Sequence, residues 1–262
     1  KSKKSKAKTF INVILLIIIF VCLGIIGKRL YDYRTNSKNK QHIDDIVMQT
    51  QEKVRKELGT TDPFEMKQAE SIEILNRFKE ENSDVVAYIE IPDTYVQYPI
   101  LKGPDNDFYL RRGLDKEYDI AGSLFVDTMN NGNFDDDNTV IYGHHLEIDA
   151  MFTALDQYRK QEFAETHRTI YVTTEDGLRE YQVFAAYGTP SDYDYRTINF
   201  GKPEDKIPYF EKLKNVSEVS LETSDFTTMD DIITLSTCQY DYDDQKLKEA
   251  MLVATQMGQV IF

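Results

Sequence analysis

The chain has few of the residue types that build disulfide frameworks and metal sites. Its 262 residues include two cysteines, Cys22 and Cys238, and four histidines. Two cysteines are too few for a disulfide framework, and a bridge between them would tie an apolar N-terminal segment to the end of the folded domain. Cys238 is therefore expected to be a free thiol. The acidic segment 127–138 does not fit a calcium loop, because Met129 and Asn138 occupy ligand positions. We expect neither a metal nor another cofactor.

Positive charge is scarce outside the N-terminus. Residues 1–40 hold ten lysines and arginines and one acid, a net charge of +9, although the whole chain has a formal charge of −14. The remaining residues hold 21 basic and 44 acidic side chains, a net charge of −23. A protein that binds nucleic acid needs a basic face. The acidic main body therefore argues against a nucleic-acid partner.

Charge is missing altogether from Phe10–Gly27, an 18-residue run of mostly aliphatic side chains. That length is near the ~20 residues that cross a bilayer as a helix. Five lysines precede the run and Lys28-Arg29 follow it, which favours an N-terminus inside the cell. A cleaved signal peptide is the alternative, but no small-x-small cleavage site follows the run. We expect a basic cytoplasmic tail over residues 1–9, a single-pass cell-membrane anchor over 10–27 and an extracellular body.

Residues 28–61 are mostly polar and charged, and they are interpreted as a juxtamembrane stalk with a helix around Ile43–Leu58. Asp62 and Pro63 then predict the start of a second helix, because Asp can cap a helix and Pro suits its first position. Apolar residues recur on one face of that helix, at Ala69, Ile72, Leu75 and Phe78. This helix is expected to open a folded domain over residues 62–262.

From Val86 onward the pattern changes to short runs that are rich in β-branched and aromatic residues and bounded by turn residues. The predicted strands are Val86–Ile91, Tyr95–Leu101, Ser123–Asp127, Thr139–Tyr142, Thr169–Thr173, Glu180–Tyr187, Val219–Glu222, Asp231–Thr237 and Met251–Gln256. Helical inserts are expected at Ala150–Glu165 and Glu204–Lys214. Many short strands in one domain predict a mainly β fold, either a closed barrel or a sandwich.

One of these strands leads into the second cysteine. Alternation along Ile232–Cys238 places Thr234, Ser236 and Cys238 on one face. The end of a strand beside a polar loop is a common place for a catalytic group. Taken alone, Cys238 also fits the description of a small buried hydrophobic residue, because free cysteine is among the most buried types.

Another predicted strand, Thr139–Tyr142, ends at Gly143, which is followed by His144 and His145. Glycine permits a sharp turn that would tip His144 into a cleft. In isolation, either histidine also fits a position at the surface or at the edge of the core.

Together these two strands resemble the sortases. Thr234–Cys238 matches the T-L-x-T-C signature of that family, and Tyr142-Gly143-His144 matches its catalytic-histidine strand. Upstream blocks resemble class B in particular and follow in the family's order: Asp84–Ile91, Tyr98–Ile100, Asn106–Tyr109 and Gly122–Asp127. Glu204–Lys214 fits the long helix that class B members carry before the cysteine strand. The resemblance covers roughly residues 62–256.

What the resemblance implies is a sortase-type closed β-barrel of about eight strands, with an N-terminal helix and inserted helices, that acts as a membrane-anchored cysteine transpeptidase. Cys238 would attack the scissile carbonyl of a sorting motif near the C-terminus of a secreted surface protein and form a thioacyl intermediate. His144 would protonate the departing amine. An amine acceptor, from a cell-wall peptide or a pilin lysine, would then resolve the intermediate. Ser236 and Thr237 would line the substrate groove beside Cys238.

One expected part of that site is missing. Sortases carry an arginine at the start of the last strand, where it stabilises the substrate and the oxyanion, but Ala250 precedes the aliphatic run 251–254 here. Three explanations are open: a loss at Ala250, a lysine substitute, or recruitment of a distant arginine, the last in the chain being Arg196. Our hypothesis is that Lys248, on the same strand face as Ala250, partly substitutes and contacts the substrate. Lysine supplies charge but lacks arginine's planar fork of donors.

Two other functions are open, and the first of them would use the same residues. A cysteine hydrolase would accept water in place of an amine, and a surface-anchored binding module would keep the fold with an impaired active site. An assay with and without an amine nucleophile separates the first from a transpeptidase. Labelling of Cys238 by a substrate-like electrophile separates the second.

Overall fold

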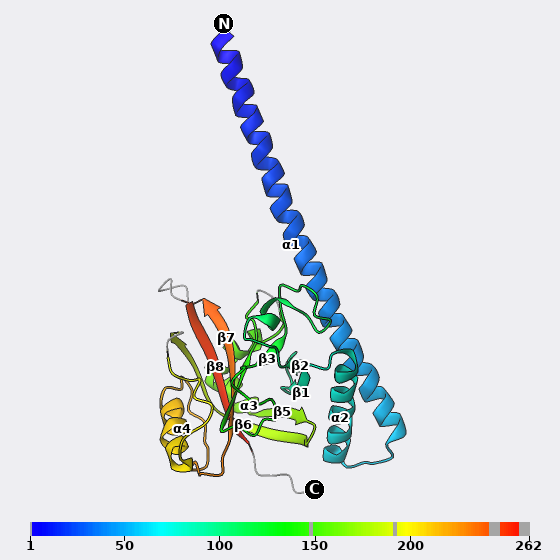
Figure 1. Cartoon of the computed structure of the whole chain (residues 1–262), viewed down its shortest axis with the longest axis vertical. Helices are drawn as coiled ribbons and strands as arrows, with labels where there is room; N and C mark the ends of the chain where they lie inside the picture. Colours follow the sequence, from blue (N-terminus) through cyan, green and yellow to red (C-terminus); the bar gives the residue numbers. More distant parts are fainter. Residues whose placement is uncertain (1, 147–148, 191–192, 241–246, 257–262) are drawn as a thin grey trace.

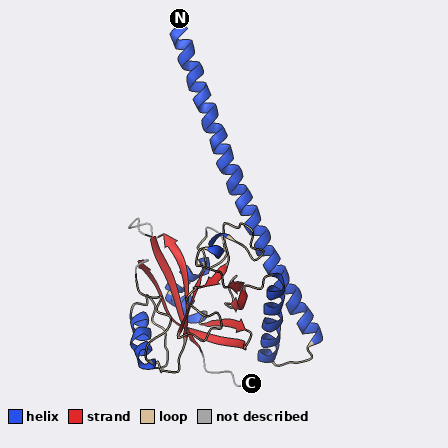
Figure 2. Cartoon of the chain, in the orientation of Figure 1, coloured by secondary structure: helices blue, strands red, loops and turns tan. Residues whose placement is uncertain are grey.

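The structure, a computed structural model, describes residues 2–146, 149–190, 193–240 and 247–256, without the side chains of residues 2–9, 238–240, 247–250 and 255. Within these ranges, eight strands form a closed barrel in the order β1-β2-β3-β4-β7-β8-β6-β5 (Figures 1 and 2). The strands are β1 (Val85–Glu90), β2 (Gln97–Leu101), β3 (Leu124–Val126), β4 (Asn138–Tyr142), β5 (Thr169–Thr174), β6 (Gly177–Pro190), β7 (Ile232–Tyr240) and β8 (Leu247–Gln256). The barrel confirms the expected mainly β fold of about eight strands.

β7 lies between β4 and β8 and forms part of the core. Residues 232–237 are all buried, and their mixture of β-branched and apolar side chains suits a strand that is covered on both faces. β7 pairs in parallel with β4, from Asn138↔Ile232 to Tyr142↔Ser236, and antiparallel with β8. Because parallel strands end at the same edge of a sheet, the segments that follow Tyr142 and Ser236 emerge together.

The helix α2 (Pro63–Glu81) begins where the sequence predicts it. Asp62 is the N-cap, and its side chain accepts hydrogen bonds from the amides of Phe64 and Glu65 at 2.8 and 2.9 Å. The buried face is shifted from the expected one, because Ala69 and Ile72 are only half-buried. The fully buried residues are Glu70, Ser71, Ile74, Leu75 and Phe78.

The helix α1 (Ser2–Glu57) is continuous, and its N-terminal half projects away from the barrel (Figure 1). Among the described residues, α1 is the one helix with a stretch long and apolar enough to cross a membrane, and its Phe10–Gly27 segment is exposed. The C-terminal part differs from the expected stalk because it packs against the domain. Its buried residues recur every three or four positions, which gives the helix a stripe for packing: Ile43, Ile46, Val47 and Thr50.

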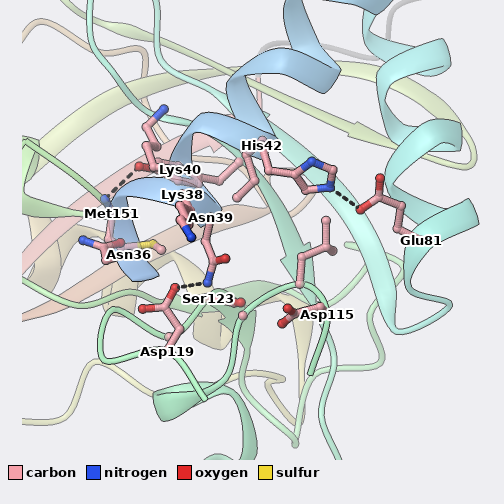
Figure 3. A pocket seen from close by; sticks show the side chains of 15 residues that line it. Asn36, Lys38, Asn39, Lys40, His42, Glu81, Asp115, Asp119, Ser123 and Met151 are labelled. Atoms are coloured by element: carbon pink, nitrogen blue, oxygen red, sulfur yellow. Dashed lines mark hydrogen bonds and ion pairs between the residues drawn. The ribbon is translucent and has the colours of Figure 1, made fainter. Parts of the chain in front are cut away.

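A cavity of about 310 Å³ lies at the junction between α1 and the body of the domain (Figure 3). Beside it, His42 Nε2 lies 2.8 Å from a carboxylate oxygen of Glu81, at the end of α2. Asn39 Nδ2 donates a hydrogen bond to Asp119 at 2.6 Å. Exposed ion pairs contribute little to stability. The buried stripe of α1 therefore supplies most of the attachment.

One predicted strand is wrong. Val219–Glu222 has no strand pairing, because its backbone groups bond to side chains rather than to a neighbouring strand. One amide of the segment donates to Gln161 at 2.9 Å, and one of its carbonyls accepts from Arg168 at 2.5 Å. Its apolar side chains are buried, which produces the strand-like alternation in the sequence.

The helical inserts lie where they were expected, with different internal structure. The first is divided into a 3₁₀ helix, η2 (Thr153–Arg159), and α3 (Gln161–Thr166), because Lys160 between them has an extended backbone. The second contains a short 3₁₀ turn, η3 (Pro203–Asp205), followed by α4 (Lys206–Asn215). Figure 1 shows α4 and α2 on opposite sides of the barrel. A further 3₁₀ turn, η1 (Phe108–Arg111), precedes β3.

Candidate active site

The ends of β4 and β7 bring the two predicted catalytic residues into neighbouring parts of the backbone. The amide of Gly143 donates to the carbonyl of Ser236 at 3.0 Å, which continues the β4–β7 ladder beyond β4. His144 follows immediately. Cys238 lies two residues after Ser236 on β7, where its backbone pairs with Glu249 of β8.

Gly143 is required at this point because there is no room for a side chain. A Cβ added there would collide with the side chains of Leu124 and Phe152. Gly143 is not among the glycines with a positive φ. We expected glycine here because it permits a sharp turn, and that reason is wrong. Close packing, and not a left-handed backbone, excludes other residues at this position.

His144 is half-buried, and its ring nitrogen Nε2 lies 2.7 Å from the carbonyl oxygen of Leu110. A carbonyl can only accept, so Nε2 carries the proton in this contact and Nδ1 is the acceptor nitrogen. Burial lowers the pKa of His144 below its ordinary value, and the nearby positive charge of Arg111 acts in the same direction. The bond to Leu110 and the charge of Asp119 offset part of that effect. His144 is therefore mainly neutral at neutral pH.

His145 has a different environment. Its Nε2 lies 2.6 Å from a carboxylate oxygen of Asp156 in η2. The hydrogen bond to that carboxylate raises the pKa of His145, against a smaller opposing effect of burial. The pair fixes the loop that follows β4, and His145 does not line the cavity that His144 lines.

A cavity of about 290 Å³ opens at this end of the barrel. Its lining comes from several strands and from three connecting segments: Asn106, Leu110, Phe125, Tyr142, Gly143, His144, Arg196, Ser236 and Thr237. The cavity thus joins the predicted histidine to Ser236 and Thr237, which directly precede Cys238. Its size is near the lower end of the range typical of ligand sites.

The two β7 residues that line the cavity are almost completely buried. The hydroxyl of Ser236 lies 3.1 Å from the hydroxyl of Tyr195. The hydroxyl of Thr237 is buried and has no hydrogen-bond partner among the described residues. It is one of several buried hydroxyls without a partner in the described part of the chain, although buried hydroxyls are normally hydrogen-bonded.

One wall of the cavity is fixed by a buried carboxylate. Asp127 accepts hydrogen bonds from the Tyr142 hydroxyl at 2.7 Å and from Asn106 Nδ2 at 3.1 Å. Burial, together with the bond to Asp127, raises the pKa of Tyr142. Tyr142 is therefore a neutral hydrogen-bond donor and a rigid surface for whatever enters the cavity.

Arg196 also lines the cavity, and the sequence alone gave it no definite role. Its Nη2 donates to the Tyr195 hydroxyl at 2.8 Å. Its guanidinium carbon lies 4.8 Å from the centre of the Tyr195 ring and 5.9 Å from that of Tyr142. In the sequence, Arg196 stands out only as the last arginine of the chain. No sequence pattern placed it near β7.

Two of the predicted site residues cannot be placed at the level of their side chains. The side chains of Cys238 and Lys248 lie outside the described part of the chain. The backbone of Lys248 pairs with Gln239 of β7, and Ala250 pairs with Thr237. The start of β8 therefore runs beside the end of β7 that carries Cys238.

The sequence matches the Sortase domain family over residues 89–257. Sortase B of Listeria monocytogenes is 39% identical over 63% of this chain and 67% of its own length, and sortase B of Staphylococcus aureus is 30% identical over 91% and 93%. Among solved structures, a Staphylococcus aureus sortase B–substrate complex is similar, with a TM-score of 0.72 at 27% identity over 86% of this chain and 98% of that one.

The family match covers more than half of the chain and contains both His144 and Cys238. These three relatives are sortases of the B type, and the closed barrel agrees with them. The chain therefore belongs to the sortase family and is a class B sortase, a cysteine transpeptidase.

Proposed function

We propose that this chain cleaves a sorting motif of a secreted protein and transfers the new carboxyl end to an amine, with Cys238 as nucleophile and His144 as acid–base partner. The observation that carries the proposal is the cavity at the ends of β4 and β7. It contains His144 together with Ser236 and Thr237, the two residues that directly precede Cys238. Membership of the sortase family supplies the reaction class.

The first half of the reaction forms a thioester. The Cys238 thiolate attacks the scissile carbonyl carbon of the sorting motif, and the carbonyl electrons move to oxygen. When the tetrahedral intermediate collapses, the C–N bond breaks and the departing amine takes a proton from the His144 imidazolium. The substrate acyl group is then bound to the sulfur of Cys238.

The second half reverses these steps with a new amine. The acceptor attacks the thioester carbonyl, His144 takes the proton that the amine loses, and the C–S bond breaks. The thiolate is restored, and the product contains an amide bond. No other reactant is consumed, because one amide bond is exchanged for another.

The protonation state of His144 sets a condition on this cycle. Burial lowers the pKa of His144, so the neutral imidazole predominates at neutral pH. Since the leaving amine needs a proton, the imidazole must first take one from the thiol. The Nδ1 atom serves for that exchange, because Nε2 is engaged with the carbonyl of Leu110.

We further propose that α1 anchors the enzyme in the cell membrane, with its N-terminus inside and the barrel outside the cytoplasm. The exposed apolar stretch Phe10–Gly27 and the lysines before it support this placement. Proteins that carry sorting motifs would then meet the active site after export. The acceptor is proposed to be an amine of a cell-wall peptide or a pilin lysine. One of the similar solved structures is a sortase B in complex with triglycine, which makes that peptide a suitable first acceptor to test.

The test is an assay of the full chain in detergent against a panel of sorting-motif peptides, with and without triglycine. We expect a ligated product that requires triglycine, and a thioacyl adduct on Cys238 that is detected by mass spectrometry. Cys238→Ala should abolish the adduct, whereas Cys22→Ser, the matched control, should retain it.

Other outcomes would contradict the proposal in distinct ways. Cleavage at the same rate with and without triglycine, and with no ligated product, would identify a hydrolase. Absence of any adduct would leave a binding module with an impaired site. An adduct that persists in Cys238→Ala would refute the assignment of the nucleophile.

A further inference from the structure

Attack on a carbonyl places negative charge on oxygen, and an active site normally provides donors for that charge in advance. Among the described residues that line the cavity, Arg196 is the one with a permanent positive charge. His144 cannot serve, because burial lowers its pKa and it must exchange a proton during the reaction. The residue ahead of the aliphatic run in β8 is Ala250, which offers no charge.

Arg196 is held in place by groups that also contact β7. Its Nη2 donates to the Tyr195 hydroxyl at 2.8 Å, and the same hydroxyl lies 3.1 Å from the hydroxyl of Ser236. Tyr195 is completely buried. The guanidinium is thus connected through the Tyr195 side chain to Ser236, two positions before Cys238. The guanidinium carbon also lies 5.9 Å from the centre of the Tyr142 ring.

The segment that carries Arg196 is fastened to the barrel at the start of β4. The side-chain amide of Asn138, which is fully buried, donates to the carbonyls of Tyr195 and Thr197 at 3.2 and 3.0 Å. The backbone amide of Asn138 donates to the carbonyl of Ile198 at 3.0 Å. Because Asn138 also accepts a hydrogen bond from Thr234 of β7, the segment, β4 and β7 form one hydrogen-bonded unit.

We propose that Arg196 is a catalytic residue of this sortase, which donates N–H groups to the oxyanion in both tetrahedral intermediates. This inference rests on the proposed transpeptidation. Arg196 stays protonated throughout and exchanges no atom. Its side chain is exposed, so a peptide that enters the cavity would cover it and strengthen its interaction with the developing charge. Arg196 thereby takes the role that an arginine at position 250 would otherwise have.

The experiment compares two reactions of the same thiol in the full chain, with Cys22→Ser as the background. Acylation by a sorting-motif peptide passes through an oxyanion, whereas alkylation by iodoacetamide does not. We expect Arg196→Gln to slow acylation by about 10²–10³-fold, the usual loss for one oxyanion donor. Alkylation of Cys238 should stay within about twofold of the parent rate. The acylation rate of Arg196→Lys should lie between the rates of the parent chain and Arg196→Gln, because lysine keeps the charge but lacks the planar fork of donors.

Arg77→Gln is the matched control, because Arg77 is an exposed arginine on α2 whose ion pair is with Glu80. It should leave both reactions unchanged. Acylation by Arg196→Gln within about threefold of the parent rate would overturn the proposal. An equal fall in acylation and alkylation would overturn it as well, since that result indicates a structural role. A parent chain that is alkylated but forms no thioacyl adduct would refute the proposed function itself, and this inference with it.

Discussion

The Nε2 atom of His144 lies 2.7 Å from the carbonyl oxygen of Leu110. Since Leu110 precedes β3 and His144 follows β4, the contact closes one side of the cavity between two connecting segments. A backbone carbonyl accepts but cannot donate, so it selects the tautomer with hydrogen on Nε2. Leu110 therefore acts through its backbone, and its influence does not depend on the type of side chain at that position.

The two adjacent histidines are predicted to titrate on opposite sides of the ordinary value of 6.5. His144 should titrate below 6.5, because burial disfavours its charged form, and His145 above it, because Asp156 stabilises that form. Side-chain nitrogen NMR of the full chain in detergent, with His144→Asn and His145→Asn for assignment, measures both midpoints. Asp156→Asn should lower the midpoint of His145 and leave that of His144 in place. A midpoint for His144 at or above 6.5 would contradict the prediction.

His144, and not His145, is predicted to be essential for catalysis. Only His144 lines the cavity, whereas His145 is paired with Asp156. His144→Ala should lower the transpeptidation rate by about 10²–10⁴-fold, the range for loss of a general acid–base group. His145→Ala is the matched control and should cost less than about tenfold. Steady-state kinetics at several pH values measure both, and the reverse order of effects would refute the assignment.

Gly143→Ala is predicted to damage both stability and activity. The added methyl group would collide with Leu124 and Phe152 in a packed region, and overpacking typically costs about 1–3 kcal/mol. The same strain would displace His144, so the rate of transpeptidation should also fall. Gly201→Ala is the control, because no described atom beyond its two chain neighbours lies within 4 Å of a Cβ at that position. Urea unfolding and the peptide assay measure the two effects. Identical behaviour of the two variants would show that Gly143 has no special requirement.

The orientation in the membrane gives a prediction at the level of the cell. If the N-terminus is inside, protease added to intact cells that produce the chain should remove the barrel and leave a fragment that contains Phe10–Gly27. The proposed function calls for this placement, because exported substrates would have to reach His144 and Cys238. A cytoplasmic marker protein controls for cell integrity. Full protection of the barrel until the cells are permeabilised would contradict the topology.

Local patterns in the sequence were sufficient for most of the strands and for the two strand ends that meet at the cavity, whereas the closed barrel was expected only from the resemblance to the sortases. Short β-branched runs bounded by turns predicted the strands, and two of them ended at Gly143-His144 and at Cys238. The parallel pairing of β4 and β7, which joins those ends, could not be obtained from spacing. That pairing depends on contacts between residues almost one hundred positions apart, such as Thr234 with Asn138.

The features that the sequence did not predict have related causes. The alternation in Val219–Glu222 reflects the burial of its apolar side chains. Its backbone bonds to the side chains of Gln161 and Arg168 and not to a strand, and no local sequence pattern reveals those partners. Residues 28–61 were interpreted as a juxtamembrane stalk because they are mostly polar and charged. Its buried stripe around Val47 becomes meaningful only when the surface against which it packs is known. Arg196 had no assigned role for the same reason.

The last prediction concerns Lys248, which the sequence-based hypothesis proposes as a partial substitute for the arginine expected at Ala250. The backbone of Lys248 pairs with Gln239, one residue beyond Cys238, so the start of β8 lies close to the nucleophile's strand end. Lys248→Ala should lower the transpeptidation rate, but by a smaller factor than Arg196→Gln. A lysine contributes a single point charge, whereas the guanidinium presents a planar fork of donors.

Ala250→Arg provides the complementary measurement. Ala250→Arg should raise the transpeptidation rate of the parent chain. It should raise the rate of Arg196→Gln by a larger factor, because the guanidinium of Arg196 is missing in that background. Both rates are measured with saturating peptide and triglycine, and thermal unfolding checks that each variant is folded. If Lys248→Ala leaves the rate unchanged, Lys248 has no role in catalysis. If Ala250→Arg also fails to restore the rate of Arg196→Gln, the start of β8 does not reach the reacting carbonyl, and stabilisation of the oxyanion depends on the segment that carries Arg196.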